Sequence, residues 1–352
     1  MVVPDLTMVA TANAVTSIGA SVIFADVEPD TLCLSARSLL ARPGTLTERT
    51  KVVVFVALNN RARDLAGLVA FAHSRGLRVL EDSAQSVGAM WRGQHLGTLG
   101  DLGTFSFSSP KIISTGQGGA VVVPAHGADP HDLAAALRRL KNFGRAGSGA
   151  DNYLAGKALN FKFTDMAAAL GRVQVRKLPG RVQRMRQIWA RYDRGLQGVR
   201  GIRLGPGGDL ADESNAFADP GWIPWFIDAF IGPADEGGTG GTVTRGATTG
   251  AGTGAVATRA ALQRWLKQHA VGTRPMYPSL STQAAFADHP DYAPPPLEST
   301  NQSSTAHRFP NSLAAAESGL FLPSSSTLTD GQVDHVCALI RLFFSTHTPL
   351  TS

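Results

Sequence analysis

Three short stretches in the first third of the chain carry side chains that could do chemistry together. They are Glu81–Gln85, Ser106–Lys111 and Thr115–Gly119. A lysine amine such as that of Lys111 becomes nucleophilic when it is partly removed from water, because burial disfavours its charged form. Hydroxyl groups and the backbone N–H groups of a glycine-rich turn bind phosphate, and the carboxylate of Asp82 can hold a positive charge. Together the stretches indicate a site where a lysine amine and a phosphorylated group meet.

Each stretch alone has an ordinary structural explanation. An aspartate at the end of a strand, such as Asp82, often caps a helix. A lone lysine such as Lys111 is usually solvated at the surface, and a glycine-rich turn before a strand is usually only a turn. The chemical interpretation therefore depends on the fold bringing the three stretches together.

The elements around these stretches alternate between strand and helix. Buried or alternating apolar patterns predict five strands, and a helix is expected at Asp64–Ser74. Such βαβ units predict an α/β fold with a mostly parallel sheet, whose ligands bind beyond the carboxyl ends of the strands. Asp82 and Ser106 fall at two such ends. The expected strands are Ser21–Asp26, Lys51–Leu58, Leu77–Leu80, Gly103–Phe107 and Gly119–Val123.

The second half of the chain predicts a smaller α+β unit. The proposed division is a large domain over residues 1–185 and a C-terminal domain over 186–352, since a long helical pattern from Val182 leads away from the sheet. Residues 234–257 are rich in Gly and Thr and are expected to form a flexible loop. The other expected elements are helices at His131–Leu140, Thr164–Val175 (with Thr164 as N-cap), Arg259–His269 and Asp330–Phe344, a strand-like stretch at Trp222–Ile231 and an irregular segment at 289–304.

Composition narrows the class of protein. The net charge is +6, and its basic residues cluster at Arg172–Arg194, which favours a solvated helix face over a nucleic-acid site. No run of about 18 apolar residues predicts a membrane span, and the first residues do not read as a secretion signal. Cys33 and Cys337, the two cysteines, are far apart in sequence, which fits a reducing compartment. We expect a cytoplasmic protein without nucleic-acid or membrane partners and without a metal.

The ordered motifs resemble the DegT-type nucleotide-sugar aminotransferases over nearly the whole chain. The family's opening VPxxTFVATANAV-like segment, its Asp-x-x-His/Gln motif and its Ser-Phe-x-x-x-Lys motif all have counterparts. So do its Gly-Glu-Gly-Gly turn and its Asn-x-x-x-Thr-Asp segment. The matching residues are Val3–Val15, Asp82 with Gln85, Ser106 with Lys111, Gly116–Gly119, Asn160–Asp165, Gly272–Pro275 and Leu322–Ser325.

This resemblance implies a fold type I (aspartate-aminotransferase-like) transferase with pyridoxal 5'-phosphate as cofactor. Lys111 would form the internal Schiff base and shuttle a proton. Asp82 would pair with the pyridine nitrogen, and Gln85 would lie near the ring hydroxyl. Met8 stands where the family usually stacks an aromatic residue on the ring. Ser106 would bind the phosphate, and Asn160 would reach the phosphate of a neighbouring subunit, so a homodimer with shared active sites is expected.

The implied reaction is transfer of an amino group to a keto group of a nucleotide-linked deoxysugar, in deoxyaminosugar and polysaccharide biosynthesis, with glutamate as donor. Lys111 favours transamination, because relatives with His at that position are dehydratases. Asn59-Asn60-Arg61 and Ser109–Gly116 resemble perosamine-synthase-like members, which favours a GDP-linked 4-keto-6-deoxyhexose. Arg274 is a candidate for contacting the substrate, and Arg172–Arg194 could face its diphosphate, although simple surface charge fits that stretch better.

One departure from the family keeps two alternatives open. The family has about fifty further residues before the equivalent of Val3, including a Gly-Thr-Ala-type turn that holds the cofactor phosphate. We therefore expect an N-terminally truncated chain. One alternative is a catalytically impaired, aminotransferase-like protein with a binding or regulatory role. The other is a sugar dehydratase that depends on the same cofactor or its amine form.

Overall fold

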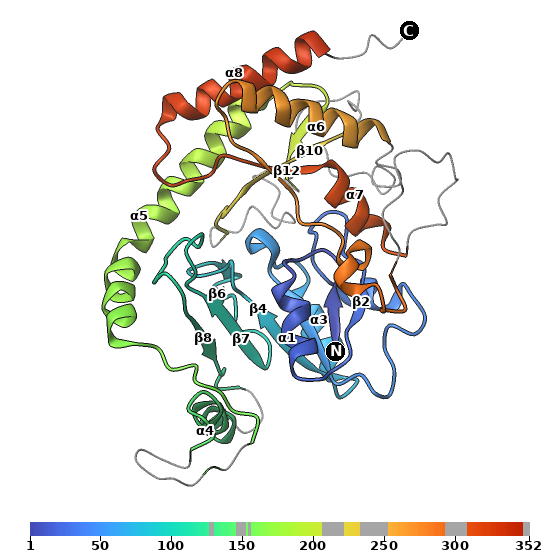
Figure 1. The fold of residues 1–352 in the computed structure, drawn as a ribbon, viewed down its shortest axis with the longest axis vertical. Coiled ribbons are helices and arrows are strands. Elements are labelled where there is room, and N and C mark those ends of the chain that lie inside the picture. Colours follow the sequence, from blue (N-terminus) through green and yellow to red (C-terminus); the bar gives the residue numbers. More distant parts are fainter. Residues whose placement is uncertain are drawn as a thin grey trace.

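The fold has two main sheets, and in the view of Figure 1 the smaller one lies in the upper half and the larger one in the lower half. The computed structural model describes residues 1–126, 130–145, 153, 156–205, 222–232, 253–292 and 308–347. The larger sheet has six strands, which are in spatial order β2 (Ile23–Ala25), β1 (Val2–Pro4), β3 (Val52–Val56), β4 (Arg78–Asp82), β7 (Leu102–Ser106) and β8 (Gly119–Val122). All its pairings are parallel except that of β7 with β8.

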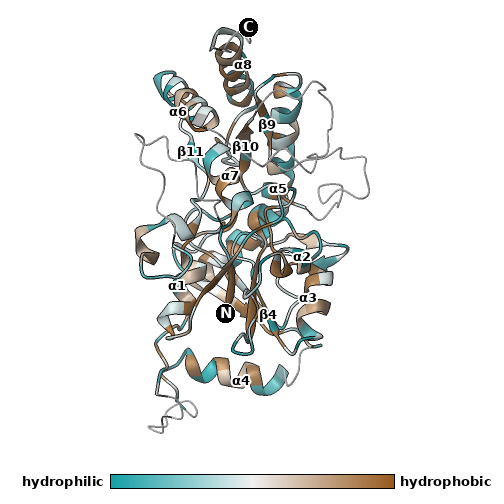
Figure 2. Cartoon of the chain, turned by 90° about the vertical axis from the view of Figure 1, so that its right-hand side faces the viewer, coloured by the Kyte–Doolittle hydropathy of each residue, from teal (hydrophilic) through white to brown (hydrophobic). Residues whose placement is uncertain are grey.

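The larger sheet is the α/β sheet that the sequence predicts. Its middle strands are apolar and buried, as Figure 2 shows by their brown colour, and Val53 and Phe55 of β3 are fully buried. A strand covered on both faces reads as a continuous apolar run, which explains why β3 was visible in the sequence. The helices of this part are α1 (Ala10–Ser17), α2 (Ala36–Leu40), α3 (Leu65–His73) and α4 (Pro130–Leu140), and a short hairpin pairs β5 (Met90–Trp91) with β6 (Gln94–His95).

The smaller sheet is antiparallel and belongs to the second half of the chain. Its spatial order is β11 (Arg274–Pro275), β12 (Gly319–Leu322), β10 (Ile227–Ile231) and β9 (Ile202–Leu204). The expected strand at Trp222–Ile231 is confirmed only over Ile227–Ile231, and the expected C-terminal helix is confirmed as α8. The accompanying helices are α6 (Thr253–Gln268), α7 (Pro310–Ser318) and α8 (Asp330–His347), with single 3-10 turns at Leu280–Thr282 and Ala284–Phe286. A further 3-10 turn, Leu58–Asn60, follows β3 in the first half.

The helix α5 (Asp165–Leu196) joins the two parts and corrects one expectation. Thr164 is its N-cap as predicted, and its hydroxyl accepts a hydrogen bond from the N–H of Ala167 at 3.2 Å. The sequence predicted a helix at Thr164–Val175 and a separate helical pattern from Val182. That was wrong: α5 continues through Pro179. A proline removes one backbone hydrogen bond, and the packing of Leu178 near Gly88 and of Met185 and Ile188 in the core holds the helix together.

A second correction concerns the glycine-rich insertion. It was expected to be a loop over residues 234–257, but residues 253–257 form the start of α6, because the alanines there favour a helix. Residues 234–252 lie outside the described part of the chain, as do residues 293–304 of the expected irregular segment.

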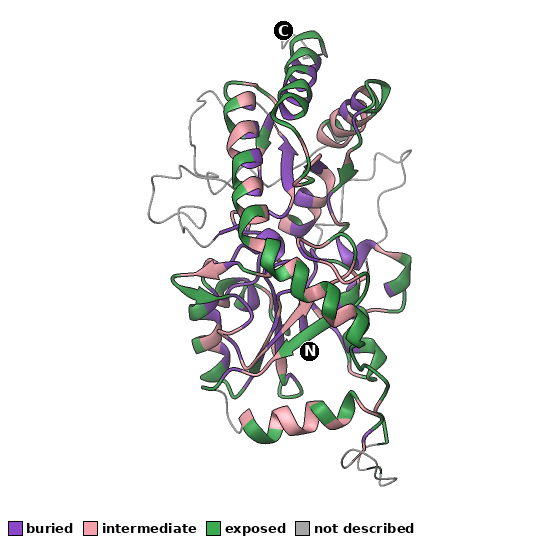
Figure 3. Cartoon of the chain, turned by 90° about the vertical axis from the view of Figure 1, so that its left-hand side faces the viewer, coloured by how far each residue is buried: buried purple, intermediate pink, exposed green. Residues whose placement is uncertain are grey.

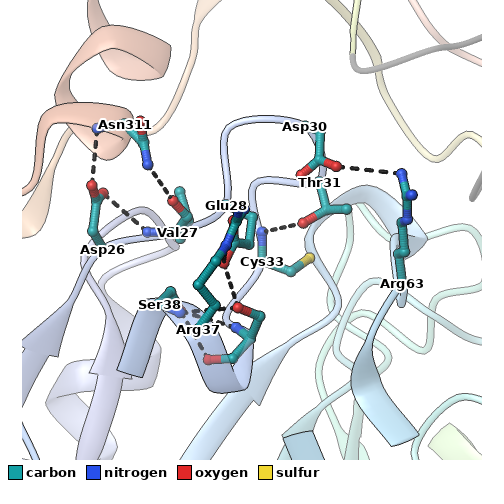
Figure 4. Close-up of polar contacts among 11 residues, drawn as sticks. Asp26, Val27, Glu28, Asp30, Thr31, Cys33, Arg37, Ser38, Arg63 and Asn311 are labelled. Carbon is teal, nitrogen blue, oxygen red and sulfur yellow. Dashed lines mark hydrogen bonds and ion pairs between the residues drawn. The ribbon is translucent and has the colours of Figure 1, made fainter. Parts of the chain in front are cut away.

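Three carboxylates that follow β2 of the larger sheet form hydrogen bonds and ion pairs with neighbouring elements (Figure 4). Asp26 accepts hydrogen bonds from the N–H groups of Asn311 and Ser312, at 3.0 and 2.9 Å, and so caps the start of α7. Farther along, Glu28 pairs with Arg37 and Asp30 pairs with Arg63. The carboxylate of Asp26 therefore joins the end of a strand in the larger sheet to a helix of the second half.

Several arginines of the basic stretch of α5 form hydrogen bonds and ion pairs within the protein. The guanidinium of Arg181 donates to the carbonyl of Ile112 at 2.7 Å. Other arginines of the stretch pair with acidic residues of α8 or with backbone carbonyls: Arg184 with Asp330, Arg186 with the Trp222 carbonyl and Arg191 with Asp334. None of the described helices is long and apolar enough to cross a membrane.

Candidate active site

Two neighbouring parallel strands of the larger sheet end in polar side chains. Asp82 is the last residue of β4, and Ser106 is the last residue of β7. The two strands pair directly, with Asp82 opposite Thr104, so both side chains lie at the same edge. Lys111 follows in the loop after β7, where its N–H donates to the carbonyl of Ser108 at 3.0 Å. The structure therefore brings Asp82, Ser106 and Lys111 to one edge of the sheet, as predicted.

The carboxylate of Asp82 is held by two donors. Its Oδ2 accepts a hydrogen bond from the Thr11 hydroxyl at 2.7 Å, and its Oδ1 accepts one from the N–H of Ala84 at 3.2 Å. The Thr11 hydroxyl also lies 3.2 Å from that of Thr7. These two donors hold the Asp82 carboxylate in a fixed position at the carboxyl end of β4.

Glu81, the neighbour of Asp82, has a structural role instead. Successive side chains of a strand point to opposite faces, and Glu81 is fully buried. It accepts hydrogen bonds from the N–H groups of Gly97, Leu99 and Gly100, each at 2.7 Å. Of the two carboxylates in Glu81–Gln85, only that of Asp82 faces Lys111 closely enough to affect its charge.

The Lys111 amine lies in a half-buried position that favours its neutral form. Burial lowers the pKa of the Lys111 ammonium, the Asp82 carboxylate opposes this effect, and the Arg274 guanidinium adds to it. The ammonium lies above the ring of Trp225, with Nζ 4.3 Å from the ring centroid. A lysine amine with a lowered pKa and a carboxylate within electrostatic range is suited to nucleophilic attack and proton transfer.

Hydroxyl groups and a glycine turn complete this edge. The Ser106 and Ser108 hydroxyls lie 3.1 Å apart, and the N–H of Ser108 donates to Ser106 Oγ at 3.3 Å. In the predicted turn, Gly118 has a φ of +131°, and a Cβ there would come within 2.3 Å of the Phe163 ring. Only glycine fits that position. The turn is therefore packed beneath the segment that leads into α5.

Comparison with known proteins now assigns the chain to a family. Residues 1–218 and 247–341 match the DegT/DnrJ/EryC1/StrS aminotransferase family. The chain belongs to this family. The gap in the match, residues 219–246, overlaps the glycine-rich insertion.

Individual relatives agree with this assignment. The dTDP-4-dehydro-2,3,6-trideoxy-D-glucose 4-aminotransferase of Saccharopolyspora spinosa is 37% identical over 220 residues, which are 58% of this chain and 54% of that protein. The GDP-perosamine synthase of Caulobacter vibrioides is 34% identical over 200 residues, 56% of this chain and 50% of that protein. The chain thus spans about half the length of these curated relatives.

The fold agrees as well. The crystal structure of the aminotransferase TlmJ from Streptoalloteichus hindustanus superposes with a TM-score of 0.76 at 29% identity, over 98% of this chain and 79% of that chain. Together with the mostly parallel sheet, this shows the fold type I architecture of pyridoxal-phosphate transferases, as the motifs predicted.

The family implies pyridoxal phosphate as the cofactor, and the residues present fit it. A half-buried primary amine (Lys111) can bind an aldehyde, and a fixed carboxylate (Asp82) can pair with a protonated ring nitrogen. The Ser106 and Ser108 hydroxyls can donate to a phosphate. Among the described residues, no group of three His, Cys, Asp or Glu side chains could hold a metal ion.

Gln85, the next predicted cofactor residue, is buried and has a protein partner. Its Oε1 accepts a hydrogen bond from the N–H of Asn59 at 2.7 Å. Met8 is 47% exposed, and its sulfur accepts from the N–H of Ala10 at 3.1 Å. The stacking role of Met8 stays a prediction.

The two remaining predicted residues lie farther out. The Arg274 guanidinium, carried by β11, stacks on the rings of Phe226, Tyr277 and Phe321, with centroid distances of 5.1, 5.4 and 4.9 Å. Its electrostatic effect on Lys111 places Arg274 at the rim of the site. Asn160 is exposed and forms an isolated β-bridge with Asn142, so its role at a neighbouring phosphate stays a prediction.

Sequence reasoning missed three residues of this site. Thr11 orients Asp82, Trp225 covers Lys111, and Asn59 holds both Gln85 and the Trp225 segment. Thr11 lies inside the matched opening segment, which was the only local signal for it. Trp225 precedes a short strand more than a hundred residues from Lys111, so spacing gave no hint of their contact.

Proposed function

We propose that the protein is a pyridoxal-phosphate-dependent aminotransferase that acts on a keto group of a nucleotide-linked deoxysugar. The observation that carries this proposal is the half-buried Lys111 amine within electrostatic range of the fixed Asp82 carboxylate. The family membership supports the reaction class, and both curated relatives described above are named as enzymes of sugar metabolism. We place the site in a large domain, residues 1–185, closed by a smaller one, residues 186–352.

The roles of the side chains follow from their chemistry. Bound pyridoxal phosphate supplies an aldehyde for a primary amine and a ring that draws electrons from the reacting carbon. Lys111 would hold that aldehyde through Nζ and, when free, would carry a proton there. Asp82 would pair with the ring nitrogen. Ser106, with Ser108 beside it, would bind the phosphate, and Gln85 would lie near the ring hydroxyl.

The choice of nucleotide is the finer part of the proposal. We favour a GDP-linked 4-keto-6-deoxyhexose with glutamate as donor, on the resemblance of Ser109–Gly116 to perosamine-synthase-like proteins. The second motif used for that choice, Asn59-Asn60-Arg61, has interior partners, including the ion pair of Arg61 with Asp228. It does not support a preference for GDP, and a dTDP-linked sugar is the competing outcome.

We further propose that the functional unit is a homodimer. An unusual number of large apolar side chains is exposed on β8, around the end of α4 and on the first half of α5, a region with much exposed surface in Figure 3. Water-exposed apolar patches of this kind usually mark contact surfaces. We call this surface the apolar face, and it consists of Val121, Leu140, Phe143, Tyr153, Leu159, Phe161, Phe163, Met166, Leu170, Val173 and Val175.

Asn160 lies within the apolar face, between Leu159 and Phe161. Its position on this exposed face supports the proposal that it binds the cofactor phosphate in the site of a second copy of the chain. The free, buried Cys33 and Cys337 fit a reducing compartment, and we propose the cytoplasm.

The test combines cofactor binding and product analysis. The purified protein is incubated with pyridoxal phosphate, glutamate and either GDP- or dTDP-linked 4-keto-6-deoxyhexose, and products are identified by mass spectrometry. We expect an amino sugar from the GDP substrate. A product that has lost water would favour the dehydratase alternative. A protein that binds no cofactor at saturating concentration would favour the binding or regulatory alternative.

A further inference from the structure

The Lys111 ammonium rests on an aromatic face that comes from the second half of the chain. We propose that Trp225 is the docking site of the Lys111 amine whenever that amine is free, and that Asn59 is the positioning residue that holds Trp225 there. This inference rests on the proposed function, in which Lys111 alternates between a bonded and a free amine. Trp225 belongs to none of the motifs that suggested the site, and Asn59 belongs only to the Asn59-Asn60-Arg61 motif, which suggested the substrate.

The first support is the geometry of the contact. Lys111 Nζ lies 4.3 Å from the centroid of the Trp225 ring, well inside the range of cation–π attraction. The Trp225 side chain is only 6% exposed, and its Nε1–H donates to the carbonyl of Pro110 at 3.2 Å. Because Pro110 directly precedes Lys111, the ring is fastened to the same loop that carries the amine.

The second support is the amide of Asn59, whose hydrogen-bonding capacity is fully used. Its Oδ1 accepts from the N–H groups of Trp225 and Phe226, at 2.9 and 2.8 Å. Its Nδ2 donates to the Phe226 carbonyl at 2.9 Å and to Asp228 Oδ1 at 3.0 Å. A primary amide has two donors and two acceptor positions. The Asn59 side chain therefore clamps the Trp225 segment and has no capacity left for a substrate.

The third support is the backbone of Asn59, which joins this clamp to the cofactor edge. Its N–H donates to Gln85 Oε1 at 2.7 Å, and its carbonyl accepts from Trp222 Nε1 at 3.1 Å. Asn59 has a φ of +51°, a left-handed conformation that asparagine tolerates better than most residues. Asn59 thus fixes the positions of Gln85 and Trp225 relative to each other.

An aromatic face suits the free amine of Lys111 for a chemical reason. An indole ring attracts an ammonium but does not take its proton. The attraction offsets part of the cost of burying the charge, so the ring holds Nζ in the site whenever the amine carries a proton. Without the ring, the buried amine would lose its proton more readily or swing out toward water.

The experiment measures the reactivity of Lys111 in the cofactor-free protein. Acylation of Lys111 is followed by mass spectrometry of its peptide over a range of pH. The midpoint of the rate profile reports the pKa of the amine, and the plateau at high pH reports its accessibility. Trp225→Leu keeps an apolar wall but removes the aromatic face. It should shift the midpoint downward and raise the neutral-pH rate roughly two- to fivefold, while Trp225→Phe should restore most of the difference.

Asn59→Ala should shift the midpoint as Trp225→Leu does, because the ring is no longer held. The matched controls are Asn60→Ala and Trp222→Phe. Asn60 donates to the Ile223 carbonyl at 2.6 Å, and Trp222 Nε1 donates to the Asn59 carbonyl at 3.1 Å, so both fasten the same loop through bonds other than those that hold Trp225. These controls should lower the unfolding temperature but leave the midpoint in place.

The outcomes separate the two proposals. A midpoint unchanged in Trp225→Leu, or moved equally by the controls, overturns the docking role of Trp225. A change only in the plateau would mean that Trp225 merely shields Lys111, which also contradicts the proposal. If the wild-type protein binds no pyridoxal phosphate but the midpoint still moves in Trp225→Leu, the docking contact stands and the proposed function fails.

Discussion

The edge of the larger sheet and the apolar face differ in how completely their side chains find partners within the described part of the chain. At the edge, Asp82, Gln85 and Asn59 all have protein partners, and Trp225 is buried. On the apolar face, Phe161 is 70% exposed and Met166 is 85% exposed. Buried polar groups need partners, and exposed apolar groups are unfavourable in water. The edge of the sheet is therefore an organised region within one chain, whereas the apolar face is suited to contact with another molecule.

The largest expected effect comes from breaking the interior of the organised region. Arg61→Ala should lower the free energy of unfolding by about 3–5 kcal/mol, because Asp228 would remain buried without its cation. Urea denaturation measures the loss. The double variant Arg61→Met, Asp228→Leu should recover most of it. An Arg61→Ala protein as stable as the wild type would show that this ion pair does not hold the two halves together.

The next effect concerns the anion of the site. Asp82→Asn should lower kcat by roughly a hundred- to a thousandfold, because it removes a preorganised charge at the reacting group. Steady-state kinetics with the keto-sugar measure it. Thr11→Val keeps the carboxylate but loses one of its donors, so it should cost about tenfold. Equal losses in the two variants would contradict the assignment of the charge to Asp82 itself.

A buried carboxylate at the carboxyl end of another strand of the sheet, that of Asp5 after β1, should make the stability depend on pH. Its Oδ1 accepts a hydrogen bond from the N–H of Ser281 at 2.7 Å. Burial raises the pKa of Asp5 from 3.8 to about 6. Because the folded pKa lies above the unfolded one, the native state binds this proton more tightly. Relative to Asp5→Asn, the wild type should be most stable below the unfolded value and lose up to about 3 kcal/mol as the pH rises through about 6. Denaturation of both proteins across that range tests it, and parallel curves would refute it.

The smallest of these effects tests the apolar face. Phe161→Asp should weaken self-association roughly thirtyfold, because a carboxylate would be buried where an aromatic side chain packs. Sedimentation velocity over a range of concentrations measures the change. Ile18→Asp, at an equally exposed apolar residue of α1, is the matched control and should leave association unchanged. A wild-type protein that stays monomeric would remove the apolar face from the account.

Much of the larger sheet could be predicted from the sequence, because strands such as Lys51–Leu58 are buried on both faces and read as apolar runs. The short strands β1, β9, β11 and β12 were not predicted, since two to four residues are too few to show a period. Lys111, Asp82 and Ser106 were predicted from motifs, and the structure brings them together.

The residues that position those three were not predictable by spacing. Thr11 comes from a helix 71 positions before Asp82, and Asn59 meets Trp225 across 166 positions. Such contacts exist only once the chain has folded. The continuity of α5 through Pro179 is of the same kind, because packing overrides a local helix breaker.

The central claim is that Lys111 is the amine that bonds to the cofactor. The most direct measurement is to incubate the protein with pyridoxal phosphate, reduce it with borohydride, and locate the modified residue by mass spectrometry. The account predicts stoichiometric modification of Lys111 and none in Lys111→Ala. Modification spread over surface lysines such as Lys177 and Lys267, with Lys111 untouched, would contradict it.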